Sequence, residues 1–197
     1  MKGLQATGFV NVARSVEGVQ LGILNIADSV KKSAQIGILS INRNGINRME
    51  ILASETFYGQ ARLKLGIPKF YNIFSIDSRL DDQGFIWGLG YGFGSSFELS
   101  QKLDLSIDAT SFLMSDGAFF TTDLNSLNRI TSGVTWKLSD KLGLYAGGSL
   151  NVALSGIYDD DSEQFKSRIA PYSNYTEVVG NTQVKVYPGF NIGLSIL

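Results

Sequence analysis

The feature that most constrains this chain is a strict two-residue alternation between large apolar residues and small or polar ones. In "GFIWGLGYGFGSSFEL", residues 84–99, glycine occupies positions 88, 90, 92 and 94, and large apolar or aromatic residues occupy the odd positions from Phe85 to Phe93. Side chains of a β-strand point alternately to its two faces, so this segment predicts a strand with one apolar face. Because glycine weakens an ordinary strand, its recurrence on the other face indicates a place where neighbouring side chains crowd.

Similar alternation elsewhere predicts a series of antiparallel strands, of which the segment 69–79 alternates least regularly. The predicted strands span residues 54–66, 69–79, 84–99, 103–115, 124–138, 142–157 and 183–197. Short turns are expected at "GIPKF" (66–70), "LSQKLDL" (99–105) and "LSDKLGL" (138–144), and longer polar connections at 114–123 and 158–182. Short turns therefore gather at one end of an up-and-down sheet, and long loops gather at the other.

The first 45 residues carry an internal repeat, in which Gln5, Gln20 and Gln35 recur at a spacing of 15. A period this short suits one β unit per copy. Copies related by translation would form the coils of a short solenoid, whereas antiparallel copies would form the first strands of a barrel. The sequence favours antiparallel strands, because three copies are a bare minimum for a solenoid and no capping unit is visible. Adding them gives about ten strands, within a range of eight to twelve, with 43–53 and 80–83 among the long-loop connections.

Composition excludes several classes of function. The chain of 197 residues has 17 basic and 18 acidic residues, a formal charge of -1, and neither cysteine nor histidine. The balanced charge argues against a nucleic-acid partner. Without cysteine and histidine the chain has no disulfide, thiolate metal site, histidine-ligated zinc or Ser-His-Asp triad. We therefore expect a non-enzymatic protein without a cofactor, folded as a single domain over residues 1–197.

The acidic stretch "YDDDSEQF" at 158–165 is the one weak candidate for a metal site. Asp159, Asp161 and Glu163 offer the oxygen ligands that calcium prefers. The stretch lacks the EF-hand spacing and its glycine, so a solvated loop is the favoured interpretation. Charged residues at 77–82 are similarly interpreted as surface turn residues.

The two faces of the predicted strands differ in a way that favours a membrane protein. The polar face is mostly glycine, serine, threonine and asparagine, which fit a crowded interior better than a water-exposed surface. The apolar face would form a large exposed patch in water, but lipid would cover it. The residues expected to face lipid are Phe85, Trp87, Leu89, Tyr91, Phe93 and Trp136, and those expected to face the lumen are Arg62, Lys64, Asp104, Asp108, Arg129 and Lys137.

The sequence therefore predicts an all-β protein, an antiparallel up-and-down β-barrel of the transmembrane type. The expected partners are membrane lipids, and the expected state is a monomer with a plugged lumen or a narrow solute path. The alternative is a soluble β-barrel or sandwich that binds a lipid or another apolar ligand. The N-terminus has no apolar segment of the signal-peptide type, so outer-membrane location requires an export signal that this chain does not contain.

Several segments carry a family resemblance. The repeats of the form "GVQLGILNIADS", followed by "NGINRMEILASETFYGQARLKLGIPKFYNI", "WGLGYGFGSSFELSQKLDLSID", "LNSLNRITSGVTWKLSDKLGLYAGGSLNV" and the closing "VYPGFNIGLSI", resemble surface-repeat, outer-membrane β-barrel-like proteins of Gram-negative bacteria. The resemblance covers nearly the whole chain and consists of strand and turn patterns, not active-site signatures. It implies a barrel in the cell envelope with a structural, surface-exposed or minor transport role, and it transfers no functional residue.

Overall fold

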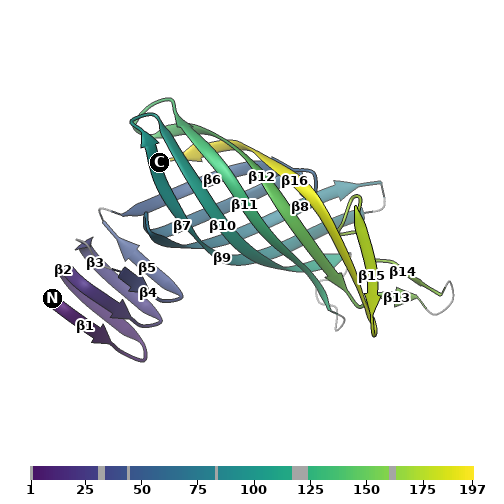
Figure 1. The fold of residues 1–197 in the computed structure, drawn as a ribbon, viewed down its shortest axis with the longest axis horizontal. Coiled ribbons are helices and arrows are strands. Elements are labelled where there is room, and N and C mark those ends of the chain that lie inside the picture. Colours follow the sequence, from purple (N-terminus) through teal and green to yellow (C-terminus); the bar gives the residue numbers. More distant parts are fainter. Residues whose placement is uncertain (1, 31–33, 44, 83, 117–123, 160–162) are drawn as a thin grey trace.

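The computed structural model describes residues 2–30, 34–43, 45–82, 84–116, 124–159 and 163–197. Strands and their connections make up all of these residues, and no helix occurs among them. Eight of the described strands form a closed ring of antiparallel pairs (Figure 1). In ring order they are β6 (Ile46–Ser54), β7 (Gly59–Ile67), β8 (Phe70–Asp81), β9 (Gly84–Ser100), β10 (Leu103–Asp116), β11 (Asn125–Lys137), β12 (Leu142–Ser155) and β16 (Thr182–Ile196).

The ring closes because β16 pairs with strands on both of its sides. It pairs with β12 from Leu142 opposite Ile196 to Ser155 opposite Gln183, and its last residues pair with β6. Beyond the end of β6, the first part of β16 pairs instead with β15 (Tyr175–Val179), which extends past the ring. Two further strands, β13 (Tyr158–Asp159) and β14 (Gln164–Phe165), form a small separate hairpin. The all-β, barrel-like character predicted from the alternation is thus present.

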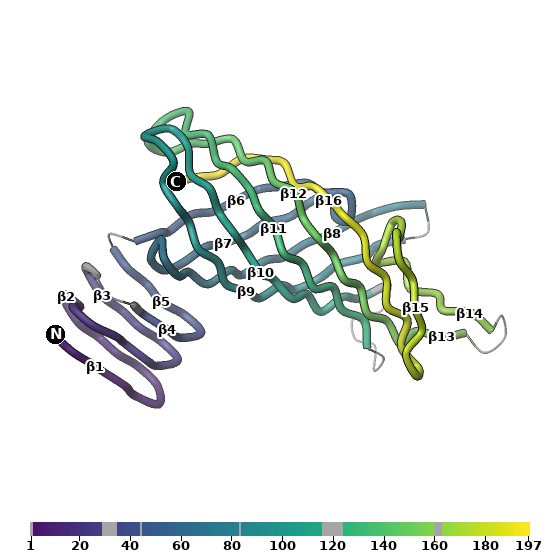
Figure 2. Tube along the Cα trace, in the orientation of Figure 1, coloured from purple at the N-terminus to yellow at the C-terminus, as the bar shows by residue number. Residues whose placement is uncertain are grey.

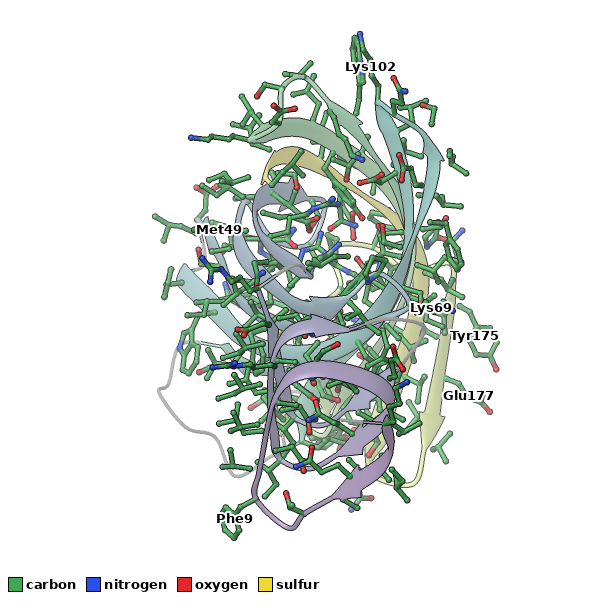
Figure 3. The ribbon with its side chains drawn as sticks, turned by 90° about the vertical axis from the view of Figure 1, so that its left-hand side faces the viewer. Phe9, Met49, Lys69, Lys102, Tyr175 and Glu177 are labelled. Carbon is green, nitrogen blue, oxygen red and sulfur yellow. The ribbon has the colours of Figure 1, made fainter. Side chains whose placement is uncertain are left out.

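The ring has two unlike ends (Figure 2). Tight turns join β7 to β8, β9 to β10, and β11 to β12 at one end, which we call the short-turn end. Lys69 and Lys102 mark two of these turns in Figure 3. At the other end, which we call the long-loop end, β6, β8, β10 and β12 end and β7, β9, β11 and β16 begin. Most of the connection expected at 114–123 lies outside the described residues. The expected short turns do lie together at one end, and the long connection 156–181 lies at the other, although the β8–β9 connection there spans only residues 82–83.

One ring strand differs from the sequence prediction. Residues 43–53 were expected to be a long-loop connection, but Ile46–Ser54 is the strand β6, and the expected strand 54–66 contains the loop between β6 and β7. In β6, inward Arg48 and Glu50 alternate with outward Met49 and Ile51, so this segment has the two-residue period of a strand with charged inward residues. The chain consequently enters the ring at the short-turn end. The irregular segment 69–79 is the regular strand β8.

The 15-residue repeats form a parallel solenoid, so the favoured expectation that they begin the barrel is wrong. One of its sheets contains β1 (Lys2–Ala6), part of β2 (Val10–Leu21) and β4 (Ala34–Ile36); the other contains the rest of β2, β3 (Leu24–Val30) and β5 (Leu39–Asn42). Parallel stacking brings identical residues into register, and Gln20 donates a hydrogen bond to Gln5 at 2.9 Å. In an antiparallel hairpin unlike residues would lie opposite each other, so these hydrogen bonds between equivalent glutamines could not form. The ring therefore has eight strands instead of ten.

The glycines of β9 line the inside of the ring where large side chains of β10 need room. A Cβ atom on Gly90 would lie 2.6 Å from the Phe112 ring, and one on Gly88 would lie 2.7 Å from the Met114 sulfur. Both distances are too short for a side chain to fit without movement of its neighbours. The alternating glycines therefore let two adjacent strands share one narrow interior, with Phe85 and Phe93 on the outer face.

We predict that Gly90→Val destabilises the ring by about 1–3 kcal/mol, because the added methyl groups overpack the site against Phe112. Gly148→Val is the matched control, since nothing lies within 4 Å of a Cβ at that strand position. Denaturant unfolding followed by tryptophan fluorescence would measure both variants. Equal stability of the two variants would contradict the crowding explanation.

Candidate functional site

Four charged side chains meet in the middle of the ring and form what we call the central cluster: Glu50, Arg62, Lys64 and Asp108. The Lys64 Nζ lies 3.0 Å from Glu50 Oε1 and 2.8 Å from Asp108 Oδ2. Arg62 lies 3.7 Å from Glu50 and 3.8 Å from Asp108. None of the four residues is more than 3% exposed. Buried charges are tolerated only when they are paired, and here two cations and two carboxylates balance.

Two tyrosine rings complete the packing around the central cluster. The Tyr71 hydroxyl donates a hydrogen bond to Asp108 Oδ1 at 2.6 Å. The Lys64 Nζ lies 5.4 Å from the ring centres of both Tyr71 and Tyr145, within the range of cation–π attraction. Arg62 lies 5.6 Å from the Tyr145 ring. Charges and aromatic rings therefore fill the centre of the lumen together.

A second group of charges lies nearer the short-turn end. Arg48 Nη2 lies 2.9 Å from Asp104 Oδ2, and Lys137 Nζ lies 2.8 Å from Asp104 Oδ1. Arg48 and Asp104 are nearly buried, whereas the Lys137 side chain is 27% exposed. The polar interior thus reaches from the central cluster to this end of the ring.

On the long-loop side of the central cluster, Arg129 organises a polar network with two asparagines and one glutamate. Its Nε donates to Asn151 Oδ1 at 2.6 Å and its Nη1 to Asn191 Oδ1 at 3.1 Å. Its Nη2 lies 3.6 Å from Glu55 Oε1. The guanidinium carbon also lies 5.6 Å from the Phe57 ring centre. Arg129 therefore stands at the boundary between the charged interior and an apolar one.

Apolar side chains from two loops enter the ring at its long-loop end. Phe57, from the loop between β6 and β7, and Ile169, from residues 156–181, are both fully buried, and we call them the loop-end plug. They pack with inward residues of the ring strands, namely Ile86, Phe112, Met114, Leu127, Ala153 and Tyr187. Arg79 holds the loops in place by donating to the backbone oxygens of Thr56 at 3.3 Å and Arg168 at 2.6 Å.

The structure corrects the interpretation of residues 77–82 as surface turn chemistry. Asp77 and Arg79 lie in β8 with their side chains buried inside the ring. Asp77 accepts a hydrogen bond from the Ser75 hydroxyl at 2.6 Å. Asp81 lies nearer the strand end and forms an ion pair of 3.0 Å with Arg168. The alternation that marks inward positions continues further along β8 than the turn-like composition suggested.

The outside of the ring is apolar. The side chains expected to face lipid all point outward: Phe85, Leu89, Tyr91, Phe93 and Trp136 are exposed, and Trp87 is partly exposed. Strand register places Phe93, Ala109, Ile130 and Leu150 side by side on four consecutive strands. Other exposed outward residues include Met49, Ile51, Leu63, Ile76, Ile107, Val134, Leu144, Ile192 and Leu194. Polarity is therefore reversed relative to a water-soluble domain.

The six residues expected to face the lumen all lie inside the ring. Arg62, Lys64 and Asp108 meet in the central cluster, Asp104 and Lys137 pair near the short-turn end, and Arg129 stands apart from both groups. Sequence reasoning missed Glu50 because its strand was interpreted as a connection. The alternation of Arg48 and Glu50 with Met49 and Ile51 is the signal that identifies that strand.

The acidic stretch at 158–165 is only partly described. Asp159 forms an ion pair with Lys166 at 2.5 Å, and Glu163 is exposed. Asp161 lies outside the described residues. Within the part of the chain that the structure describes, no group of three or more acidic residues has a geometry suited to a metal ion.

Comparisons with protein-family models, with curated proteins and with solved structures found no match to this chain. A helix long and apolar enough to cross a membrane does not occur among the described residues. Any functional conclusion therefore depends on the geometry of the ring and of the solenoid.

Lys64→Met should destabilise the ring by about 3–5 kcal/mol, because it leaves the two buried carboxylates of the central cluster with Arg62 as the remaining cation. Adding Glu50→Gln should recover part of that loss by restoring the charge balance. Denaturant unfolding would measure both variants, with Lys69→Met at an exposed turn as the control. If Lys64→Met were as stable as Lys69→Met, the cluster would not be important for stability.

Proposed function

We propose that this chain is a non-enzymatic integral β-barrel protein of the outer membrane of a Gram-negative bacterium, with a structural and surface-exposed role. The observation that carries the proposal is the reversed polarity of the ring. Paired charges occupy its interior, and apolar side chains cover its outside. In water this arrangement exposes far more apolar surface than a soluble monomer normally does. In a bilayer, lipid covers that surface.

Strand length supports the same proposal. A strand tilted in a bilayer needs about 9–11 residues to cross the hydrocarbon region. The shortest ring strands, β6 and β7, have 9 residues each, and β9 has 17. Closure also satisfies the backbone hydrogen bonds around the ring, which lipid-exposed strands require. A closed ring leaves no unpaired ring edge that would require a partner, so we propose a monomer.

The filled lumen favours a structural role over transport. The central cluster and its tyrosines occupy the middle of the ring, and the loop-end plug occupies its long-loop end. A solute would have to displace paired charges and then Phe57 and Ile169. The soluble alternative, a carrier of apolar ligands, would require an apolar cavity where the ring holds four buried charges. We therefore propose that the protein is a structural component of the membrane and that its long-loop end is the surface it exposes.

The direct test is reconstitution. The purified chain, refolded with phosphatidylcholine and phosphatidylglycerol vesicles, should float with the vesicles in a density gradient and should migrate differently on a gel before and after boiling. A detergent-free, monodisperse soluble monomer that does not associate with vesicles would contradict the proposal.

Ile130→Arg should impair insertion, because arginine on the lipid face costs about 2–4 kcal/mol near the bilayer midplane and about 0–1 kcal/mol near the interfaces. Leu138→Arg, an exposed residue in the short turn after β11, is the control and should insert almost normally. The measurement is the fraction of each variant that acquires the folded gel mobility in vesicles. Equal insertion of both variants would show that Ile130 does not face lipid.

A further inference from the structure

The solenoid has the same reversed polarity as the ring. Gln5, Gln20 and Gln35 stack in one internal ladder, and Asn11, Asn25 and Ser40 stack in another. All of them except Gln5 are fully buried. The inside of the solenoid is therefore held by side-chain hydrogen bonds, and most of its large apolar residues lie outside.

One group of these outward apolar residues lies along one edge, and others, such as Leu4 and Ile41, lie on the strands. The turns between the two sheets repeat the pair Gly8-Phe9, Gly22-Ile23 and Gly37-Ile38. Phe9 is 76% exposed, Ile23 44% and Ile38 54%, and we call these three residues the apolar edge. Exposed Val12 and Ile36 flank it on the two sheets. Figure 3 shows Phe9 projecting from the bottom of the solenoid.

The opposite edge of the solenoid is charged. Arg14, Glu17 and Asp28 are exposed there, and Lys2 forms an ion pair with Glu17 at 3.2 Å. The chain leaves the solenoid from this charged edge through Arg43 and enters β6. The solenoid is thus an amphipathic wedge, with charges beside its connection to the ring and apolar side chains on the far edge.

The solenoid lies against the short-turn end of the ring. The Asn47 side chain donates to the Asn42 backbone oxygen at 2.7 Å. A Cβ on Gly45 would lie 2.1 Å from the Gly66 carbonyl oxygen, so the connection packs directly on β7. In Figure 1 the turns of the apolar edge lie at the lower right of the solenoid, on the side toward the long-loop end of the ring.

Several backbone groups at the apolar edge bond within the protein, as polar groups that enter lipid must. The Leu24 N–H donates to the Phe9 oxygen at 2.8 Å, and the Leu39 N–H donates to the Ile23 oxygen at 2.9 Å. Side-chain amides of the asparagine ladder donate hydrogen bonds to other backbone oxygens near these turns. Asn11 donates to the Leu21 oxygen at 2.8 Å, and Asn25 donates to the Ile36 oxygen at 3.1 Å.

We propose that the apolar edge of the solenoid inserts into the acyl chains of the same bilayer leaflet that surrounds the short-turn end of the ring. The charged edge then stays in the aqueous layer beside the connection at Arg43. The proposal rests on the membrane function proposed above. Lipid is the occupant because the apolar surface is a protruding edge that continues onto both adjoining sheets, and because the neighbouring ring presents its own apolar exterior.

Single-cysteine variants test the proposal, since the chain has no native cysteine. Ile23→Cys and, independently, Ile38→Cys place a thiol on the apolar edge. Asp28→Cys places one on the charged edge, and Ile130→Cys places one on the outside of the ring. Each thiol is labelled with the fluorophore NBD, and the labelled protein is reconstituted into phosphatidylcholine–phosphatidylglycerol vesicles. Quenching by doxyl-labelled phospholipid reports contact with lipid, and quenching by iodide reports contact with water.

We expect the labels at positions 23, 38 and 130 to lose most of their emission to doxyl lipid, and the label at 28 to be quenched by iodide instead. Lipid quenching at 130 without quenching at 23 and 38 would overturn the insertion of the solenoid and leave the membrane-spanning ring intact. Protection of the labels at 23 and 38 from both quenchers would also overturn it, because the apolar edge would then be covered by protein and not by lipid. Absence of lipid quenching at 130 would overturn the proposed function itself.

Discussion

The rest of the ring depends on the charge pairing in the central cluster. Lys64 lies within 3.0 Å of both Glu50 and Asp108, in a place where none of the four members of the cluster is more than 3% exposed. An unpaired charge there would be very costly, so the register between strands β6, β7 and β10 has to bring opposite charges together. Because the middle of the ring is charged, the main buried apolar cluster of the ring is the one around the loop-end plug. The outward apolar side chains then need an apolar environment outside the protein.

The solenoid follows the same principle with uncharged groups. Stacked Gln and Asn side chains donate hydrogen bonds to the equivalent side chains of the neighbouring copy. Each added copy therefore satisfies the hydrogen-bonding groups of the copy before it in the same way. Most of the large apolar residues of the copies lie on the outside, and the turns of one edge carry Phe9, Ile23 and Ile38. Ring and solenoid thus share one inside-out arrangement although one is antiparallel and the other parallel. This shared arrangement connects the two proposals.

Sequence alone predicted the strands with an uninterrupted apolar face, because period-two alternation in β9 or β10 has no other simple explanation. It failed at β6, where Arg48 and Glu50 occupy inward positions and resemble a polar connection. It also favoured the wrong arrangement for Gln5, Gln20 and Gln35, since a 15-residue spacing is compatible with both parallel and antiparallel stacking. The contact between Glu50 and Lys64 depends on strand register, and the burial of Ile169 depends on how a long loop folds back. Neither leaves a local pattern in the sequence.

If the ring spans a membrane as proposed, its apolar outside lies in lipid and its inside does not. The most direct measurement is solid-state or solution NMR of methyl-labelled protein in lipid nanodiscs, recording cross-relaxation from the acyl-chain methylenes. We expect strong lipid cross-peaks for the outward methyl groups of Leu89, Ile130 and Leu144, and none for the buried methyl groups of Leu127 and Thr131. Outward methyl groups that showed contact with water and none with acyl chains would contradict the proposal.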